Sequence, residues 1–565
     1  MRTVADVSPW KGITSPSFRR ALGYLRRYWG LLWLTAAFAV LYVPFAFLEP
    51  FLVRYLIDNI LLARRPDLLL RLAGGASIFF ALYGLLEFAS IYYVLRLAQR
   101  LHAAIKSDQL QNLLAKGLNF HRTTAAGRLI FAFFSDSNQI GTLLSLGLAN
   151  SALNVVFIVL RGGILYWISP RLFLISLVVI PLQAFVMWRV MKRVMRFSIE
   201  LKIMDEDLTA RIESVLRGAI AVKGFGFADP LRHLWERAFA GRLNLDFRTM
   251  IWQKGGFLVV GNIQLVGSFL VLFSGVWMVD RGLLTLGGMF AFLTVAGRLT
   301  PSVQALIGFA VTIQEALVGL ERFYRVYDLP DEAREFAHGQ AGERTLAPED
   351  LDHLTLRDVE VDHGTARIRI PCDLRMERGK HYLWHGPNGA GKTSLGLALA
   401  GLVPHRRGSI LAGDTALCDF ALPSVRAHVL YVGHEPYWPE RTLGENFSNV
   451  DGDGVLEHAR LQAALELAEA ADILDSLPLG MRTTLTGKEL SAGENQRLFL
   501  AMALYRAPRV LILDEALASV GSAVVSRIVG RLVQRGPATQ VIFVSHSTTY
   551  AEHFQGELRF PARVR

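Results

Sequence analysis

Apolar residues are concentrated in the first 330 positions, in runs that match the length of membrane-spanning helices. A helix needs about 20 mostly apolar residues to cross the hydrocarbon layer. Five segments meet this requirement, at roughly 28–53, 72–95, 143–168, 172–190 and 257–279. A sixth segment begins near Leu283, is less apolar and is interrupted by Pro301. The pattern therefore predicts six spans.

The links between the predicted spans differ in length. The links after the first, third and fifth spans are short, whereas those at about 96–142 and 191–256 are long, charged and patterned as helices. With six spans, both long loops lie on the same side as both termini. Basic residues near the N-terminus indicate that this side faces the cytoplasm, although a short link on the opposite side is also basic. These residues are Arg19, Arg20, Arg26 and Arg27, and on the opposite side Arg64, Arg65 and Arg71. The pattern predicts a multi-pass protein of the cell (inner) membrane with cytoplasmic termini.

The chain changes character near residue 330. We expect an α-helical membrane domain over residues 1–328, a polar linker over 329–350 and an α/β domain over 351–565. Composition agrees, because 52% of the residues are apolar and only 19% are charged. The net charge of +11 is better explained by loops that face anionic membrane lipid than by nucleic acid, which we do not expect as a partner. Two cysteines, Cys372 and Cys418, exclude a disulfide framework.

The C-terminal domain contains a phosphate-binding motif. The segment HYLWHGPNGAGKTSLGLALAG reads as a strand, a glycine-rich turn and a helix, and it fits the pattern G-x-x-x-x-G-K-[ST] in the context that confirms it. Backbone N–H groups of such a turn point at phosphates, Lys392 supplies positive charge and the hydroxyl of Thr393 suits Mg²⁺. The predicted ATP-binding residues of this loop are Gly386, Pro387, Asn388, Gly389, Ala390, Gly391, Lys392, Thr393 and Ser394.

Two acidic residues follow a later apolar strand, VLILD. Asp514 is predicted to hold Mg²⁺, and Glu515 is predicted to polarise the attacking water. A further apolar strand, VIFVSHS, ends at His546, which we expect to sense the terminal phosphate. Each feature alone is common in proteins that bind no nucleotide, so the prediction rests on the whole set. Together they predict a P-loop ATPase site with ATP and Mg²⁺.

The segment LSAGENQR at 490–497 indicates which class of P-loop ATPase this is, because it resembles the signature motif of ABC transporters. The resemblance implies that Ser491 and Gly493 cap ATP bound by a second subunit, and that the α/β domain includes a helical subdomain. Residues 112–140 and 213–226 are similar to the two cytoplasmic loops of ABC exporters. The resemblance therefore covers nearly the whole chain and implies a half-transporter that works as a dimer.

Several positions depart from the family pattern. His434 stands where a glutamine normally contacts Mg²⁺ and water, which makes it a candidate catalytic residue and metal ligand. His363 replaces the tyrosine that stacks on adenine, and Gly521 replaces an aspartate that couples the two sites. Within the signature, Ala492 and Glu494 replace a glycine and a glutamine. Such departures are typical of one half of a heterodimer, but a divergent homodimer explains them equally well.

The function implied is ATP-driven export of an unidentified peptide, lipid or other amphipathic substrate by alternating access. The alternative is a membrane regulator or gated pathway that binds ATP with little pumping. Polar residues within the predicted spans are either structural or in contact with substrate. They are Glu49, Glu87, Asn150, Arg161, Asn262 and Gln264. Glu49 and Arg161 fall near the outer ends of their helices and could pair.

Overall fold

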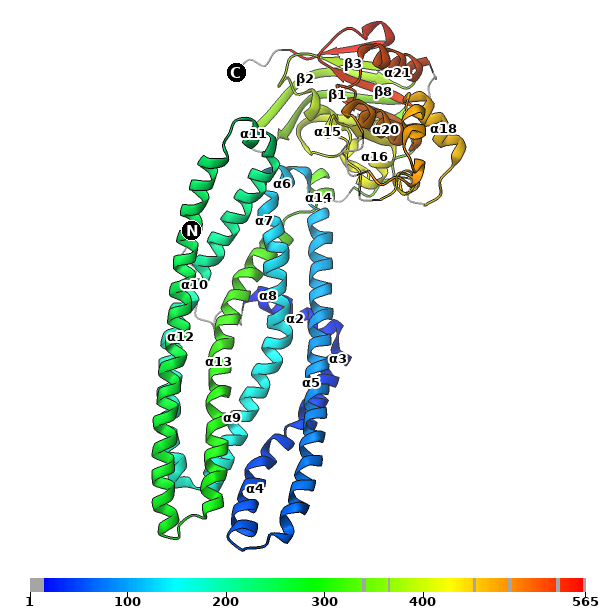
Figure 1. Cartoon of the computed structure of the whole chain (residues 1–565). Coiled ribbons are helices and arrows are strands. Elements are labelled where there is room, and N and C mark those ends of the chain that lie inside the picture. Colours follow the sequence, from blue (N-terminus) through cyan, green and yellow to red (C-terminus); the bar gives the residue numbers. More distant parts are fainter. Residues whose placement is uncertain are drawn as a thin grey trace. The chain divides into compact units, whose positions relative to one another are not determined.

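The computed structural model describes two compact units of the chain (Figure 1). The first comprises Met1–Leu114 and Thr124–Leu329, and the second comprises Ala115–Thr123 and Pro330–Arg565. Placement is described for residues 15–337, 342–363, 366–439, 441–450, 454–485, 490–534 and 539–561.

The first unit is entirely helical in its described residues and contains six helices long and apolar enough to span a membrane. These candidate spans are Trp29–Leu61, Asp67–Leu114, Ala126–Ile168, Pro170–Arg217, Ala228–Asp280 and Leu286–Ala310. The prediction of six spans is confirmed. The elements are α2 (Pro16–Arg27), α3 (Trp29–Tyr42), η2 (Phe45–Phe47), α4 (Leu48–Tyr55), η3 (Leu56–Leu61), α5 (Asp67–Leu114), α7 (Ala126–Phe131), η4 (Ala132–Asp136), α8 (Ser137–Thr142), η5 (Leu143–Gly147), α9 (Leu148–Ile168), α10 (Pro170–Arg217), α11 (Ala219–Gly224), α12 (Ala228–Asp280) and α13 (Leu286–Tyr327).

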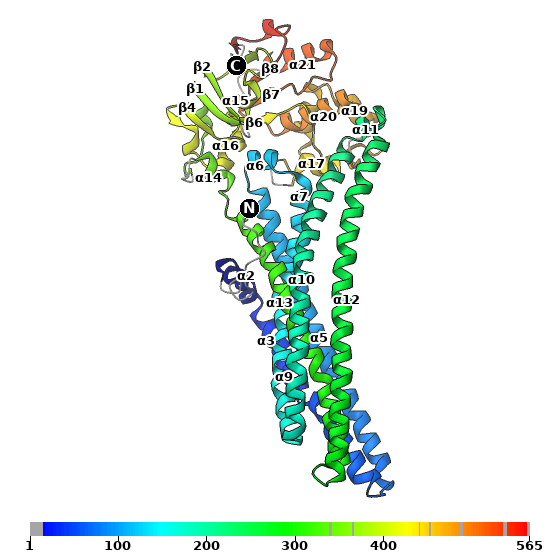
Figure 2. The ribbon, with the colours of Figure 1, turned by 90° about the vertical axis from the view of Figure 1, so that its left-hand side faces the viewer.

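The three longest of these helices are far longer than a membrane is thick. α5 and α10 have 48 residues each and α12 has 53. At a rise of about 1.5 Å per residue they extend for roughly 70–80 Å, against about 30 Å for the hydrocarbon layer. The two long links predicted to be helix-patterned are therefore mostly continuations of spans, which run side by side beyond the apolar segments (Figure 2).

The first span is broken near its middle. α3 ends at Tyr42, a short 3₁₀ turn, η2, follows, and α4 begins at Leu48. Pro44 and Pro50 explain the break, because proline has no N–H to donate and its ring clashes with the preceding turn. The residues around the break therefore lie on irregular backbone within a membrane span.

The expected pairing of Glu49 with Arg161 is wrong. The carboxylate of Glu49 forms an ion pair with Arg298 on α13. Arg161 instead donates from Nη1 to the carbonyl of Arg298, over 2.7 Å, and to Oγ of Ser302, over 2.8 Å. Sequence position along each helix approximates the depth of a residue but does not show which helix it faces.

The second unit contains two β-sheets. Antiparallel strands form one in the order β2-β1-β4-β5, and parallel strands form the other in the order β6-β7-β8-β3-β9. The strands are β1 (His353–His363), β2 (Ala366–Glu377), β3 (Tyr382–His385), β4 (His405–Ala412), β5 (Thr415–Ala416), β6 (Val429–Val432), β7 (Val510–Asp514), β8 (Gln540–Ser545) and β9 (Gly556–Arg559). β7 is buried at every position, as a central parallel strand must be.

Helices complete the second unit. They are α6 (Leu118–Thr123), α14 (Glu332–Phe336), η6 (Pro348–Leu351), α15 (Lys392–Leu399), η7 (Leu417–Asp419), α16 (Leu422–His428), α17 (Leu443–Ser448), α18 (His458–Leu467), α19 (Ala471–Ser476), η8 (Gly480–Arg482), α20 (Ala492–Tyr505), α21 (Ser522–Gln534) and η9 (Ala551–His553). One apolar cluster joins α15 to the antiparallel sheet, and another joins α18, α20 and α21 to β7 and β8. This gives the α/β domain and the helical subdomain that were predicted.

A short segment between two helices of the first unit belongs to the second. The carbonyl of Ala115 accepts a hydrogen bond from the N–H of Glu332 over 2.8 Å, and Lys116 forms an ion pair with Asp331 at 2.8 Å. Leu118 on α6 packs against the apolar core of the second unit. The link between the second and third spans is therefore held by the α/β unit.

Candidate functional site: an ATPase centre

The P-loop connects the end of β3 to the start of α15. Pro387, Asn388 and Gly389 are exposed, so the backbone of the loop is presented to solvent. Gly389 and Gly391 have φ values of 77° and 102°, which side chains other than glycine rarely adopt. A Cβ at Gly391 would also come within 2.9 Å of Ile370. The loop can therefore direct N–H groups at an anion only with glycine at these positions.

Lys392 begins α15 and folds back over the loop. Its side chain is buried, and Nζ donates to the carbonyls of Gly386, over 2.6 Å, and Pro387, over 3.0 Å. Nζ also lies 3.3 Å from Nδ1 of His546. Burial lowers the pKa of Lys392, while the charges of Glu515 and Asp514 act in the opposite direction.

Asp514 is the last residue of β7 and is only 5% exposed. Its Oδ2 accepts a 2.6 Å hydrogen bond from the hydroxyl of Tyr431. Its Oδ1 is buried and has no hydrogen-bond partner among the residues that the structure describes. A buried carboxylate oxygen without a partner is costly, and a divalent cation would satisfy it. Thr393, at the start of α15, is exposed and carries the second predicted Mg²⁺ ligand.

Glu515 and His546 meet at the same edge of the sheet. β7 and β8 are parallel neighbours paired through Asp514 and Val544, so the residues that follow both strands lie close together. The carboxylate of Glu515 contacts Nε2 of His546. Glu515 adopts a φ of 51°, an uncommon conformation for this residue type, and its N–H donates to the carbonyl of Val544 over 3.2 Å. His546 thus touches both Glu515 and Lys392.

At two of the substituted positions, no side-chain contact with this centre is described. His434 is two-thirds exposed, and its Nε2 lies 3.6 Å from the carboxylate of the adjacent Glu435. Its ring makes no ion pair with Asp514 or Glu515 in the described part of the chain. His363 ends β1, but its side chain falls outside the described residues.

The signature segment begins α20. Ser491 is exposed, and its Oγ donates to the carboxylate of Glu494, over 2.7 Å, and accepts from the Glu494 N–H. This reciprocal capping holds the pKa of Glu494 below its usual value. A Cβ at Gly493 would lie 2.9 Å from the carbonyl oxygen of Ser519. Gly493 therefore permits a close approach between α20 and the segment that follows β7.

Tyr431 and Gln496 are two site residues that the sequence did not single out. Tyr431 holds Asp514, and burial, followed by the Asp514 charge, raises the pKa of its phenol. Gln496 is buried and bridges two loops, donating to the carbonyl of His434 over 3.0 Å and accepting from the N–H of Ser519 over 2.8 Å. The sequence features that could have pointed to these two residues are a tyrosine within an apolar strand and a glutamine just after the signature.

The P-loop thus lies at one edge of a parallel sheet together with Asp514, Glu515 and His546. The described part of the same chain also contains six candidate membrane spans. These features define the class as a membrane-embedded ATPase coupled to transport. The ABC transporter transmembrane region family matches residues 32–303, and the ABC transporter family, the ATPase domain, matches residues 371–518. The chain belongs to the ABC transporters, as a half-transporter of the exporter type with both parts in one polypeptide.

Similar proteins agree with this assignment. The transport/processing ATP-binding protein ComA of Streptococcus pneumoniae is 25% identical over 512 residues, which is 88% of this chain and 69% of ComA. An ATP-dependent lipid A-core flippase of Alkalilimnicola ehrlichii is 25% identical over 93% of this chain and 89% of the flippase. A bacterial Atm1-family ABC exporter with ATP bound has the same fold, with a TM-score of 0.81, 19% identity and coverage of 95% and 93% of the two chains.

Proposed function

We propose that the chain is one half of a dimeric exporter that uses Mg-ATP to move an amphipathic substrate across the cell membrane. Both termini and the ATPase domain lie in the cytoplasm in this proposal. Two ATP molecules bind between the ATPase domains of the two subunits, their binding turns the cavity outward, and hydrolysis resets it.

The contact of His546 with both Lys392 and Glu515 is the observation that carries the hydrolytic part of the proposal. In this proposal Lys392 meets the phosphates and Glu515 takes a proton from water, and the contacts of both with His546 support these roles. A regulator that only binds ATP would not need the acid. The arrangement therefore favours pumping over the alternative of an ATP-gated pathway.

Thr393 and Asp514 would hold Mg²⁺, and bound Mg²⁺ would neutralise charge on the phosphates. The unpartnered Oδ1 of Asp514 supports this assignment. His434 would join them only if its ring turned away from Glu435, because it now lies 3.6 Å from that carboxylate. His363 would support the adenine from the end of β1.

Two exposed surfaces support a dimer. Ser491 is exposed at the start of α20, and its hydroxyl is occupied only by Glu494 among the described residues. The turn around α11 also exposes apolar side chains, of which Ile220 is 90% exposed and Phe225 is 76% exposed. Exposed apolar groups beyond the spans are typical of protein interfaces. We propose that Ser491 and Gly493 cap ATP of a second subunit and that α11 docks on that subunit.

The partner is either a second copy or a different half-transporter. Gly521 has open space around it, so nothing in the described chain requires a glycine there. The loss of the usual aspartate is therefore a change in coupling between sites rather than in folding, which is compatible with both partners.

The experiment measures ATP hydrolysis by the complex in lipid nanodiscs while amphipathic peptides and lipids are added in turn. We expect at least one class to stimulate hydrolysis several-fold in wild type and none to do so in Lys392→Ala. Hydrolysis that no amphipath changes would favour the regulator.

A further inference from the structure

The short helix α2 lies directly before the first candidate membrane span, and its two faces differ in character. Its apolar side chains Phe18 and Ala21 are 4% and 0% exposed, and they pack in one core with residues of α5, η5 and α13. The other face carries exposed arginines, among them Arg19, Arg26 and Arg27. The protein itself therefore covers the apolar face of α2, and the basic face remains exposed.

Contacts with two neighbouring helices hold α2 in place. Arg20 donates to both carboxylate oxygens of Asp328, each over 2.8 Å, and its guanidinium lies 4.2 Å from the ring centroid of Tyr324 on α13. Tyr24 hydrogen-bonds to Asp108 on α5. These contacts fix the helix, and they also engage two acidic side chains that would otherwise be available to the remaining arginines.

Three arginines of the exposed face, Arg19, Arg26 and Arg27, form no ion pair with any residue that the structure describes. Arg19 and Arg26 are seven residues apart, which is almost two full turns, so they lie on the same side of α2 with about 10 Å of helix between them. Gly23 lies between them, and no atom outside its own helix turn, among those described, lies within 4 Å of the position of its Cβ. A phosphate group can therefore approach the helix at Gly23 between two guanidinium groups, which bind phosphate oxygens in bidentate fashion.

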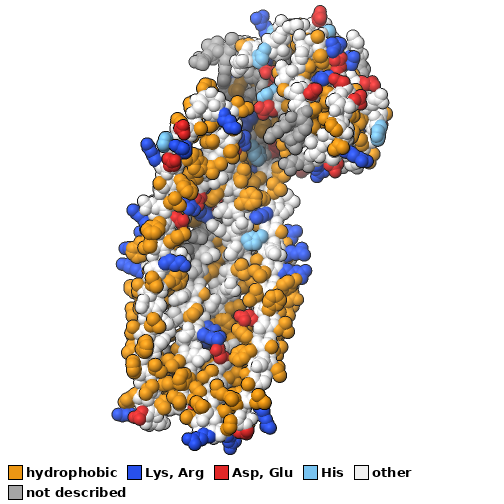
Figure 3. Space-filling view, viewed as in Figure 1, with side chains coloured by type: hydrophobic (Ala, Val, Ile, Leu, Met, Phe, Trp, Pro, Cys, Tyr) orange, Lys and Arg blue, Asp and Glu red, His pale blue; other side chains and the backbone are white. Residues whose placement is uncertain are grey.

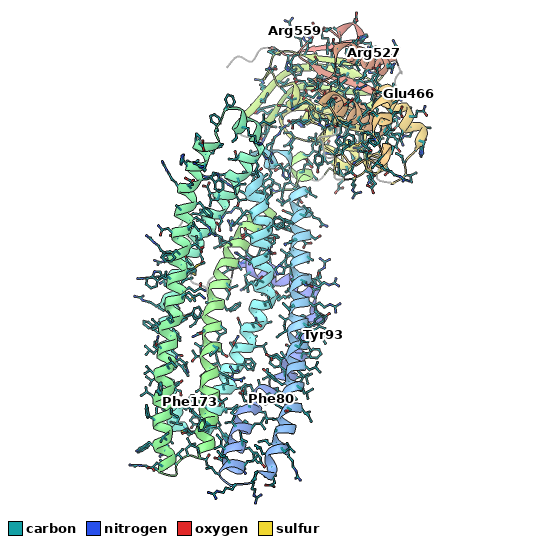
Figure 4. The ribbon with its side chains drawn as sticks, viewed as in Figure 1. Phe80, Tyr93, Phe173, Glu466, Arg527 and Arg559 are labelled. Atoms are coloured by element: carbon teal, nitrogen blue, oxygen red, sulfur yellow. The ribbon has the colours of Figure 1, made fainter. Side chains whose placement is uncertain are left out.

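The basic face lies where the apolar part of the helical unit begins. α3 starts at Trp29, directly after α2, and the rings of Trp29 and Trp33 meet edge to face at 5.6 Å and are 55% and 59% exposed. Exposed tryptophans are enriched at the level of lipid head groups. Figure 4 shows Tyr93 on α5, and its ring stacks on Phe38 of α3 at 5.1 Å, so the two spans run together from this level. Figure 3 shows basic side chains gathered at the border of the largely apolar stretch.

The link between the first two spans is also basic, but its arginines are arranged differently. Arg64 and Arg65 are exposed and lie in the turn between η3 and α5, at the opposite end of the first span. They are adjacent in a turn rather than spaced along one face of a helix. This pair therefore has the charge of Arg26 and Arg27 without the helix face that carries them, which makes it a matched control.

We infer that the basic face of α2 binds the phosphate of an anionic membrane phospholipid, with Arg19 and Arg26 on either side of Gly23 and Arg27 adding charge. A cluster of arginines on an amphipathic helix beside a membrane span is suited to such a head group. The acyl chains would lie along exposed apolar side chains of α3, which include Trp33. The tryptophan pair at the start of α3 favours a lipid over a free phosphate. The binding does not depend on the proposed export function.

The test measures retention of labelled phosphatidylglycerol by the detergent-purified complex without nucleotide, with phosphatidylcholine as the competitor of zero net charge. Wild type should prefer phosphatidylglycerol by about fivefold or more, because each free arginine adds to the attraction for an anionic lipid. The double variant Arg26→Gln, Arg27→Gln should lose most of this preference. The double variant Arg64→Gln, Arg65→Gln removes the same charge at the other end of the span and should behave as wild type.

Gly23 provides a second comparison in which every arginine is kept. Gly23→Glu places a carboxylate between Arg19 and Arg26 and should abolish the preference for phosphatidylglycerol. Gly23→Gln adds a side chain of nearly the same size without charge, so it should reduce retention much less. The open space around Gly23 allows both side chains to be accommodated without repacking.

Equal retention of the two lipids by wild type, or equal losses in the two double variants, would overturn the proposal. Equal losses in Gly23→Glu and Gly23→Gln would overturn it as well, because charge would then play no part. Release of phosphatidylglycerol by millimolar inorganic phosphate would assign the face to free anions and overturn the lipid. If the Arg26→Gln, Arg27→Gln variant does not fold, the two Gly23 variants decide.

Discussion

The residues of the hydrolytic centre contact one another directly. His546 touches both Glu515 and Lys392, and Tyr431 holds one oxygen of Asp514. Such contacts hold Glu515, Lys392 and Asp514 in fixed positions, and positioning is the main contribution that a protein makes to phosphoryl transfer. Each contact therefore predicts a distinct consequence of substitution.

Glu515→Gln should lower the rate of ATP hydrolysis by about 10²- to 10⁴-fold, the usual contribution of a general base. ATP binding should persist, because Lys392 and the P-loop are unchanged, so an ATP-bound dimer should accumulate. Phosphate release and retention of labelled ATP measure the two effects. Glu552→Gln, at an exposed position on η9, is the control. Hydrolysis near the wild-type rate in Glu515→Gln would show that another group activates the water.

Tyr431→Phe should destabilise the nucleotide-free protein by about 1–3 kcal/mol, because it leaves a buried oxygen of Asp514 without its donor. Mg-ATP should reduce this difference, since the cation places positive charge beside the same carboxylate. Thermal unfolding with and without Mg-ATP, on a Glu515→Gln background, measures both. Tyr437→Phe, whose ring is 74% exposed, should change nothing. An equal loss of stability with and without Mg-ATP would show that the hydrogen bond of Tyr431 is independent of the metal site.

Among the elements, α20 connects the signature to two loops of the ATPase centre. Gln496 bridges His434 and Ser519, and Asn495 accepts a 2.6 Å hydrogen bond from Trp438. A shift of α20 would therefore move the segment around His434 and the one that leads to Gly521 together.

Gly493→Ala should disturb this connection, because the added Cβ would meet the Ser519 carbonyl at 2.9 Å. We expect a loss of stability of about 1–3 kcal/mol, typical of overpacking, and a marked fall in hydrolysis. Gly530→Ala is the matched control on α21, where the nearest described atom lies 4.0 Å away. That change should be neutral or stabilise the helix by up to about 1 kcal/mol. Equal effects of the two changes would show that the close approach of Gly493 to Ser519 does not determine stability or hydrolysis.

The elements differ in how far the sequence predicts them. The six spans and the strand–loop–helix of the P-loop are predictable, because span length and glycine spacing are local properties. The ion-pair partner of Glu49 was not predictable from the sequence, because it depends on which face of α4 meets α13. Tyr431 and Gln496 were missed for the same reason. Their roles arise from neighbours distant in the chain, and their residue types are common in any buried strand or helix.

At the scale of the whole molecule, a heterodimer and a homodimer predict different losses of ATP hydrolysis for the substitutions Ser491→Ala and Lys392→Ala. In a heterodimer whose other site is inactive, Ser491→Ala should leave most hydrolysis intact, because this signature serves that site. Lys392→Ala should remove nearly all hydrolysis. In a homodimer both changes affect both sites and both losses should be severe. The ratio of the two losses, in complex purified from native membranes, decides between the partners. Losses of equal depth in a preparation of this polypeptide alone would exclude the heterodimer.

We propose above all that this chain hydrolyses ATP as one half of a two-subunit membrane complex. The most direct measurement combines particle mass with ATP hydrolysis, on complex purified from native membranes through a tag on this chain. We predict particles with two half-transporters and hydrolysis that Lys392→Ala removes. Particles that contain this chain alone in a single copy and hydrolyse ATP at the full rate, or hydrolysis that survives Lys392→Ala in every preparation, would contradict the account.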